Sequence, residues 1–438
     1  MDKNLELIKK RKFNRDISWE EIKQAIKNFE DKVSKYYGIL LYMLVVFIIL
    51  FTLASIIKNK TNFYSEDLTF RWKNVLSYDD MLYSRDIYTV NQNYEEKVMH
   101  MCIHPFFDFM AQGVATIENM IFTNNNPTDH YYHIVLFQIL INLIGVFYLY
   151  KILREELGLK KIWCFLTITI YEIATVTLLG TFIIESFLIS GTLLILSYYY
   201  LSKQKLIIST ILGILVAGMC ITNSIAFAIM AIFLLKDKKN ILKVGVSCVV
   251  VFLLVMLILP YREYIFESFF NSIKTQKDTY TLDYGLVEFI KMAFYYIGAS
   301  PIFFLNSIHI VTPAKGLDYF IFDLSSSKLV MIATIMFFIF ILYNVIRNIK
   351  DRNMLAAFGV FVYNMFIHVI LRFGLYEGTI YGLHYLFAEI LMFAFGFKIK
   401  NKIIRRVFIC FSILLLLVQI RYNMNGMLNL LLLFKDWK

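Results

Sequence analysis

The sequence predicts an all-α protein that crosses a membrane about eleven times. Of its 438 residues, 59% are hydrophobic and only 18% are charged, and the mean hydropathy is +0.62. Soluble domains are usually about 45–50% apolar and about 25% charged. Apolar runs of the roughly 20 residues that cross a bilayer recur along the chain, and Lys and Arg lie between them. The net charge of +11 therefore indicates basic inner loops and the surface of a lipid bilayer rather than nucleic-acid binding.

The first span is predicted at residues 38–57. Ten Lys and Arg precede it, so the N-terminus is expected in the cytoplasm. Residues 16–34 carry apolar side chains at helical spacing, which predicts an amphipathic helix on the cytoplasmic surface. We therefore divide the chain into an N-terminal amphipathic segment, residues 1–37, and a transmembrane domain, residues 38–438.

Two long segments, residues 58–130 and 261–327, are predicted to lie outside the cell. In the first of them, residues 105–122 begin at a proline, which is a favoured first position of a helix. This stretch is too short and too polar to cross the bilayer. It is therefore expected to form an interfacial helix on the outer leaflet.

The remaining spans follow from the positions of the basic residues. Residues 162–201 lie between basic pairs and are expected to cross twice, with a tight outer turn near Gly180. Residues 206–235 are too many for one span and few for two, so two half-length helices are expected to turn at Thr222 and Asn223. The other predicted spans are residues 131–152, 241–259, 329–346, 354–372, 380–397 and 406–422, which place the C-terminus outside.

Residues 78–109, in the first outer segment, give the strongest functional signal of the sequence. Their carboxylates include Asp79, Asp80, Asp86, Glu95 and Glu96. A carboxylate near a substrate hydroxyl can act as a general base. Arg85 lies beside Asp86, and the helix that starts at the His104-Pro105 step would favour an anionic ligand at its N-terminus. On composition alone, a solvated loop with no chemical role explains these charges equally well.

Ionisable residues also occur within or at the ends of the apolar runs. They are Glu172, Glu185, His368, Arg372, His384 and Glu389. Each costs several kcal/mol in lipid unless it faces a polar cavity, and pairing between helices is the alternative for each. Glu185, Arg372 and His384 are expected near the outer surface, which favours a shared cavity, whereas Glu172 is expected to lie deeper.

Several catalytic motifs are absent from the sequence. It contains no GxxxxGK(S/T) phosphate loop, no HExxH zinc helix and no GxSxG elbow. ATP hydrolysis, zinc proteolysis and serine-hydrolase chemistry therefore lose support.

The stretch "SRDIYTV … CIHPFFDF" carries a resemblance to a known family. An aspartate soon after the first span, a His-Pro step that opens a membrane-surface helix, and many later spans resemble the GT-C superfamily of membrane glycosyltransferases. The nearest similarity is to a bacterial branch in which an Asp-containing stretch precedes an HPL or HPP step. "IIESF" and "GMCITNSIAF" resemble later stretches of such proteins. This chain has DIY and HPF instead, which leaves open which aspartate is catalytic.

The resemblance implies transfer of a sugar from a polyprenyl-phosphate donor to an envelope glycan, lipid or protein. The reaction is expected on the outer face of the bacterial cytoplasmic membrane. Asp86 is the first candidate for the catalytic carboxylate and Asp80 the second. The resemblance also implies substrate-binding roles for Arg85, His104, Glu185, Arg372 and His384. Some relatives need a divalent metal, Mg or Mn, and others do not, so the metal stays open.

Two other functions compete with this one. A transporter or flippase of lipid-linked saccharides is less favoured, because the sequence has no internal repeat. An envelope polysaccharide polymerase or ligase is less favoured because such proteins are expected to carry a late outer loop rich in Arg and His. Residues 261–327 contain one Arg and one His.

The predicted topology can be tested by labelling in intact cells. Cysteines introduced at Asn91 and Thr279, in a background without the native cysteines, should react with a membrane-impermeant thiol reagent. Both positions lie in segments that the distribution of Lys and Arg places outside. Labelling only after permeabilisation would contradict this topology.

Overall fold

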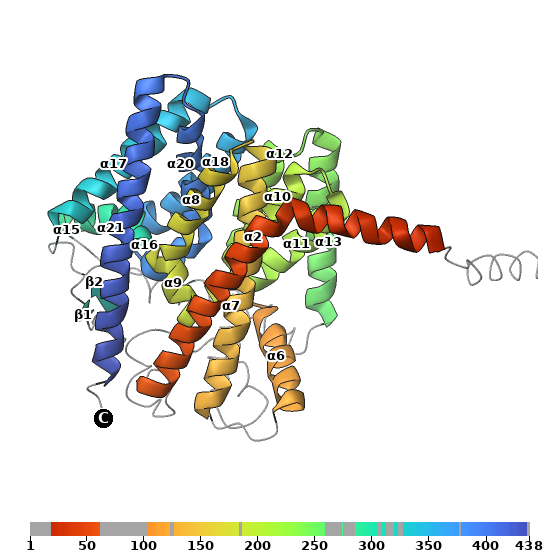
Figure 1. Cartoon of the computed structure of the whole chain (residues 1–438), viewed down its shortest axis with the longest axis horizontal. Coiled ribbons are helices and arrows are strands. Elements are labelled where there is room, and N and C mark those ends of the chain that lie inside the picture. The colour runs from red at the N-terminus through yellow and green to blue at the C-terminus, as the bar shows by residue number, and fades with distance from the viewer. Residues whose placement is uncertain are drawn as a thin grey trace, which may run out of the picture. The chain divides into compact units, whose positions relative to one another are not determined.

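The computed structural model describes residues 19–61, 104–122, 127–183, 186–258, 274, 285–304, 308–311, 319–322, 327–375 and 378–435. The chain divides into two compact units, residues 1–48 and 49–438. The described residues are mainly helical (Figure 1). They include one antiparallel hairpin, in which β1 (Ile308–Val311) pairs with β2 (Tyr319–Phe322).

Six described helices are long and apolar enough to cross a bilayer. The first is Ser34–Lys60, the apolar part of the continuous helix α2 (Trp19–Lys60), which thus includes both the expected surface helix and the expected first span. The others are α7 (Pro127–Lys151) with η1 (Ile152–Glu156), α13 (Lys238–Ile258), α17 (Lys328–Asn348), α18 (Arg352–Met365) with η4 (Phe366–Ile370), and α21 (Lys402–Lys435).

Two further spans are bent in the middle. α8 (Lys161–Ile173) and α9 (Thr175–Phe182) meet at 59°. α19 (Gly378–Tyr381) and η5 (Gly382–His384) meet α20 (Leu386–Ala394) and η6 (Phe395–Lys398) at 63°. Counting each bent pair as one span gives up to eight in the described residues. The predicted count of about eleven is therefore not confirmed.

Three shorter apolar helices complete this part of the chain: α10 (Ser186–Ser202), α11 (Leu206–Met219) and α12 (Asn223–Leu234). The half-length hairpin expected in residues 206–235 is confirmed by α11 and α12. The two crossings expected in residues 162–201 correspond to the bent pair α8–α9 and to α10, and α9 ends at Phe182, two residues after the Gly180 where the turn was expected. The additional break at Ala174, whose backbone is extended (φ −60°, ψ 142°), was not expected.

The two long segments predicted outside contain short helices. α6 (Phe107–Ile121) forms where the interfacial helix was expected. It packs against α7, and the Glu118 carboxylate lies 2.9 Å from Nδ1 of His133. The second segment contains α15 (Leu286–Phe294), η2 (Tyr295–Ala299) and α16 (Ser300–Ile302), together with the β1–β2 hairpin.

Buried side-chain amides bond the carbonyls that are freed where helices break. Asn423 of α21 donates from Nδ2 to the Ile173 carbonyl (2.5 Å), at the end of α8, and to the Ile302 carbonyl (2.7 Å). Its Oδ1 accepts from the backbone N–H of Phe304 at 2.7 Å. Since a bilayer offers no water to these groups, each needs a partner within the protein. Asn423 thus connects the end of the helix at Ile173 with the end of the helix at Ile302.

Two other amides do the same at other breaks. Gln138 of α7 donates to the carbonyls of Gly180 (2.8 Å) and Ile183 (2.7 Å), where α9 ends. Asn344 of α17 donates to two carbonyls at the end of α20, Met392 and Phe393, each at 3.1 Å. These contacts explain why strongly polar residues are fully buried inside apolar helices.

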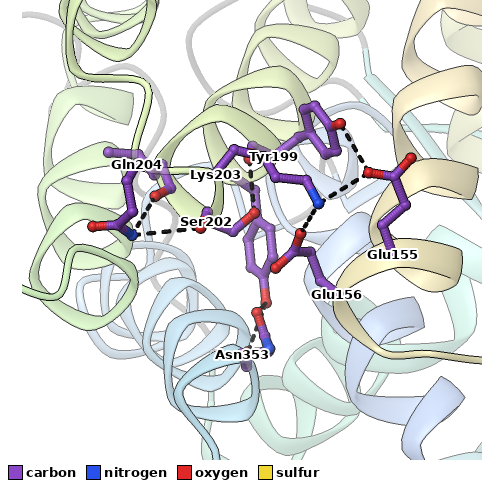
Figure 2. Close-up of polar contacts among 9 residues, drawn as sticks. Glu155, Glu156, Tyr199, Ser202, Lys203, Gln204 and Asn353 are labelled. Atoms are coloured by element: carbon purple, nitrogen blue, oxygen red, sulfur yellow. Dashed lines mark hydrogen bonds and ion pairs between the residues drawn. The ribbon is translucent and has the colours of Figure 1, made fainter.

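A cluster of charges joins the ends of α7 and α10 (Figure 2). The Lys203 ammonium lies 2.9 Å from Glu155 and 2.6 Å from Glu156. The Tyr199 hydroxyl donates to Glu155 at 3.0 Å. Partial burial alone would lower the pKa of Lys203, but its hydrogen bonds to Glu156 and Glu155 raise it above its ordinary value. Lys203 therefore stays protonated, and the two carboxylates balance its charge.

Asn423 offers a test of the amide contacts. Asn423→Leu would leave the Ile173 carbonyl and the Phe304 N–H without their partner. Each orphaned buried group costs about 1–3 kcal/mol, so the thermal unfolding midpoint of the purified protein should fall by several degrees. The exposed Asn425, two residues further along α21, is the matched control. An equal loss in Asn425→Leu would contradict this role for Asn423.

Candidate functional site

The His104-Pro105 step docks on the turn between α11 and α12. The Phe106 N–H donates to the Gly218 carbonyl at 2.8 Å. Nδ1 of His104 lies 2.6 Å from the Met219 carbonyl, and a carbonyl can only accept, so this nitrogen carries the proton. The exposed end of a half-length hairpin would leave carbonyls unbonded in lipid. The segment before α6 covers that end.

Glycine at position 218 allows this close approach. A Cβ atom placed there would lie 1.9 Å from the Phe106 ring. On the other side of the turn, the Tyr363 hydroxyl of α18 donates to the Thr222 carbonyl at 2.7 Å. The turn is therefore held both by the start of the α6 segment and by a late helix.

His104 begins a cluster of ring side chains that joins three segments of the chain. Its ring centroid lies 6.2 Å from that of Phe187, at the start of α10. Phe187 in turn lies 5.1 Å from His384 and 5.1 Å from Tyr381, both between α18 and α20. His104 and His384 therefore both contact the ring of Phe187.

The cluster continues into the interior. The rings of Tyr381 and His368 lie 4.7 Å apart, and His368 stacks on Tyr296 at 5.0 Å. The Tyr385 hydroxyl donates to the Tyr296 carbonyl at 2.7 Å. Glu389 lies one helical turn beyond Tyr385. We call the six residues His104, Phe187, His384, Tyr381, His368 and Tyr296 the ring cluster.

The three histidines of the ring cluster are buried. Nδ1 of His368 bonds the Phe373 carbonyl at 2.7 Å. Nε2 of His384, in a side chain only 2% exposed, has no hydrogen-bond partner within the described residues. The hydroxyl of Ser186, beside Phe187, also has none there. A buried polar atom without a partner is costly and rare, so this place is suited to a polar ligand.

The described residues on both sides of residues 62–103 contact the first turns of α7. Before this stretch, Lys58 pairs with Asp129, and the hydroxyls of Ser55 and Tyr132 lie 2.9 Å apart. After it, Glu118 of α6 bonds His133. Both flanks of residues 62–103 are therefore anchored at the same end of α7, away from Lys151.

Four of the predicted site residues lie outside the described residues: Arg85, Asp80, Asp86 and Glu185. Of the others, His104 and His384 are brought together through Phe187. Arg372 lies next to Phe373, which contacts the ring cluster, but its guanidinium lies 4.7 Å over the Phe289 ring. It has a left-handed backbone (φ 58°).

Two of the three glutamates predicted within the spans are described, Glu172 and Glu389, and their environments differ. Both oxygens of Glu172 accept from Nδ2 of Asn142, at 3.1 and 3.2 Å. Glu172 is therefore paired with a residue of another helix, which was the alternative to its facing a polar cavity. Glu389 is fully buried, and neither of its oxygens has a hydrogen-bond partner within the described residues. An ionisable residue inside a span is by default a candidate for function.

Sequence reasoning did not single out the aromatic members of the cluster. Tyr381 and Tyr385 flank His384 in the stretch YGLHYLF. This cluster of aromatic residues around a histidine is the sequence pattern that could have indicated them. Tyr296 and Phe187 have no comparable sign in the sequence, because tyrosine and phenylalanine are common throughout this chain. The packing of α10 brings Phe187 to His384, and the packing of η2 brings Tyr296 to His368.

The described residues contain no group of three or more His, Cys, Asp or Glu side chains arranged to hold a metal ion. Asp80 and Asp86 are not among them, so the expected Mg or Mn stays untested. Neither protein-family models nor curated proteins match this chain.

Gly218 tests the docking of the His-Pro step. Gly218→Ala should push Phe106 from its place, because the new methyl group would overlap the ring. Overpacking of this kind costs about 1–3 kcal/mol, which a thermal unfolding curve would register. Gly245→Ala on α13 is the control, since nothing lies within 4 Å of a Cβ there. Equal midpoints for the two variants would show that Phe106 does not pack on Gly218.

Proposed function

We propose that this protein is a membrane glycosyltransferase that moves a sugar from a polyprenyl-phosphate donor to a cell-envelope acceptor. The observation that carries the proposal is the contact of His104 and His384 with Phe187. His104 belongs to the His-Pro step, and His384 belongs to the turn that the resemblance assigns to substrate binding. Phe187 follows Glu185 by two residues. Three segments that are far apart in the sequence therefore meet at Phe187, as a common site would require.

The proposed reaction is a displacement at the anomeric carbon of the sugar. The acceptor hydroxyl attacks that carbon, and the bond from the carbon to the lipid-phosphate oxygen breaks. Asp86, or Asp80 in its place, takes the hydroxyl proton, and the leaving group departs as the polyprenyl phosphate anion. Arg85 and Arg372 are the candidates for stabilising that anion, and guanidinium groups suit this role.

We further propose that the reaction takes place on the extracytoplasmic face of a bacterial plasma membrane, with the N-terminus in the cytoplasm. Support comes from the charges at the two ends of α7. The first outer segment is anchored at the N-terminal end of this helix, through Asp129 and His133. Lys151 and the Lys203 cluster lie at the other end. Basic residues mark the cytoplasmic side of membrane proteins.

A transporter or flippase of lipid-linked saccharides is the second candidate. Broken helices favour it, because transporters bind their substrates where spans unwind. The bent pairs α8–α9 and α19–α20 contact each other through α9, α19 and η5. Beyond the ring cluster, Tyr385 and Glu389 continue a path of polar side chains inward, and the Glu389 carboxylate has no partner within the described residues. Such a path suits a moving ion or proton.

Asp86→Asn tests the transferase. This change keeps size and polarity but removes the base, which typically contributes about 10²–10⁴-fold. In membranes supplied with a radiolabelled polyprenyl-phosphate sugar, transfer to the acceptor fraction should nearly vanish, while the protein is still made. Asp79→Asn is the matched control and should have a mild effect.

The opposite result would separate the two candidates. If Asn at positions 86 and 80, singly and together, leaves transfer intact, the loop carboxylates are not the base and the transferase proposal fails. Glu389→Gln is then the informative variant. Loss of lipid-linked saccharide translocation by this variant in proteoliposomes, with no transfer by the wild type, would favour the transporter.

A further inference from the structure

We propose that a second site, separate from the ring cluster, binds the phosphate group of an anionic ligand. A cavity of about 410 Å³ lies where the ends of α17, η6 and α21 meet. Ligand pockets typically measure about 300–1,000 Å³. It is lined by three cations and three amides, Arg347, Lys398, Lys400, Asn344, Asn348 and Asn401. It shares no residue with the ring cluster.

The cavity is unbalanced in charge. No carboxylate lines it, and none pairs with Arg347, Lys398 or Lys400 in the described part of the chain. Lys203, by contrast, is bonded to two carboxylates at the end of α10. Basic residues at the ends of spans set topology without needing a cavity. Three cations around one cavity, none with a carboxylate partner among the described residues, indicate an anionic ligand.

Two of the cations are held by aromatic rings. The Arg347 guanidinium lies 5.7 Å from the centre of the Tyr343 ring, and the Lys398 ammonium lies 5.1 Å from that of Phe395. Both rings also line the cavity. Such contacts limit the motion of a long side chain without neutralising its charge. The planar guanidinium can bond two phosphate oxygens at once, and the ammonium acts as a point charge.

The backbone adds a further positive contribution. Asn401 caps α21, its Oδ1 accepting from the N–H groups of Ile403 (2.9 Å) and Ile404 (3.1 Å). Its Nδ2 is therefore the atom left to donate to a ligand. The N-terminus of this 34-residue helix carries a partial positive charge that favours anions.

A buried acceptor completes the lining. Asn344 is fully buried, its Nδ2 bonds the Met392 and Phe393 carbonyls, and its Oδ1 has no partner within the described residues. An oxygen acceptor suits a ligand hydroxyl. The site therefore fits a phosphate ester with a neighbouring hydroxyl. Because it lies at the ends of spanning helices, that ester is either the headgroup of an anionic lipid or a free phosphate ester.

Three probes distinguish these sources. Phosphatidylglycerol has phosphate, hydroxyls and acyl chains, diacylglycerol lacks the phosphate, and glycerol 3-phosphate lacks the chains. Binding to the full-length protein in neutral detergent would be measured by native mass spectrometry. We expect phosphatidylglycerol to bind and diacylglycerol not to. Tight binding of glycerol 3-phosphate as well would identify a soluble ester as the ligand, and its failure would identify the lipid headgroup.

The variant Arg347→Gln/Lys398→Gln/Lys400→Gln should weaken binding of the phosphate probe about tenfold or more, since three cations are lost. The control is Lys238→Gln/Lys239→Gln, which removes exposed lysines at the start of α13 that line no described cavity. All three cations of the cavity are exposed. The single variant Lys400→Gln, which changes only one of them, guards against misfolding of the triple variant and should weaken binding by a smaller factor. Equal loss in the control, or no binding of either phosphate probe to the wild type, would overturn the proposal.

Discussion

A backbone carbonyl freed inside a bilayer has no water to bond, and the described structure depends on how this need is met. Continuous helices such as α13 bond their own carbonyls and present mostly apolar side chains to their surroundings. The broken elements cannot do so. Gln138, Asn344 and Asn423 supply the missing donors, each reaching two carbonyls where another helix ends. These amides fix which helices are neighbours.

The candidate site follows from the same requirement. His104 is placed by its bond to the Met219 carbonyl at the α11–α12 turn, and His368 by its bond to the Phe373 carbonyl. Two members of the ring cluster are therefore also donors to freed carbonyls. Substituting either histidine would therefore remove a support of the fold together with a part of the candidate site. Ser186, whose buried hydroxyl bonds no carbonyl within the described residues, separates the two effects more cleanly.

Charge is used in two ways at the ends of the helices. Lys203 is satisfied by Glu155 and Glu156 and joins two helices. Arg347 and Lys398 have aromatic neighbours but no carboxylate partner in the described part of the chain. The first arrangement stabilises the protein without leaving a free charge. The second keeps two charges available to a ligand.

The sequence by itself determined the membrane class, the places of most spans and the half-length hairpin of α11 and α12. These depend on local properties, namely the length of apolar runs and the basic residues that bound them. His104 could be selected as a candidate from the His104-Pro105 step, and His384 from its place near the end of an apolar run, both with the support of the family resemblance.

Only the tertiary structure decided where helices bend and what meets there. The break at Ala174 has no Pro or Gly at that position, and the amides of Gln419 and Asn423 that bond the end of α8 come from nearly 250 residues away in the chain. Phe187 joins His104 to His384 because α10 passes between their segments, which no local pattern specifies. Helix breaks and contacts between distant segments depend on partners that a pattern of neighbouring residues does not contain.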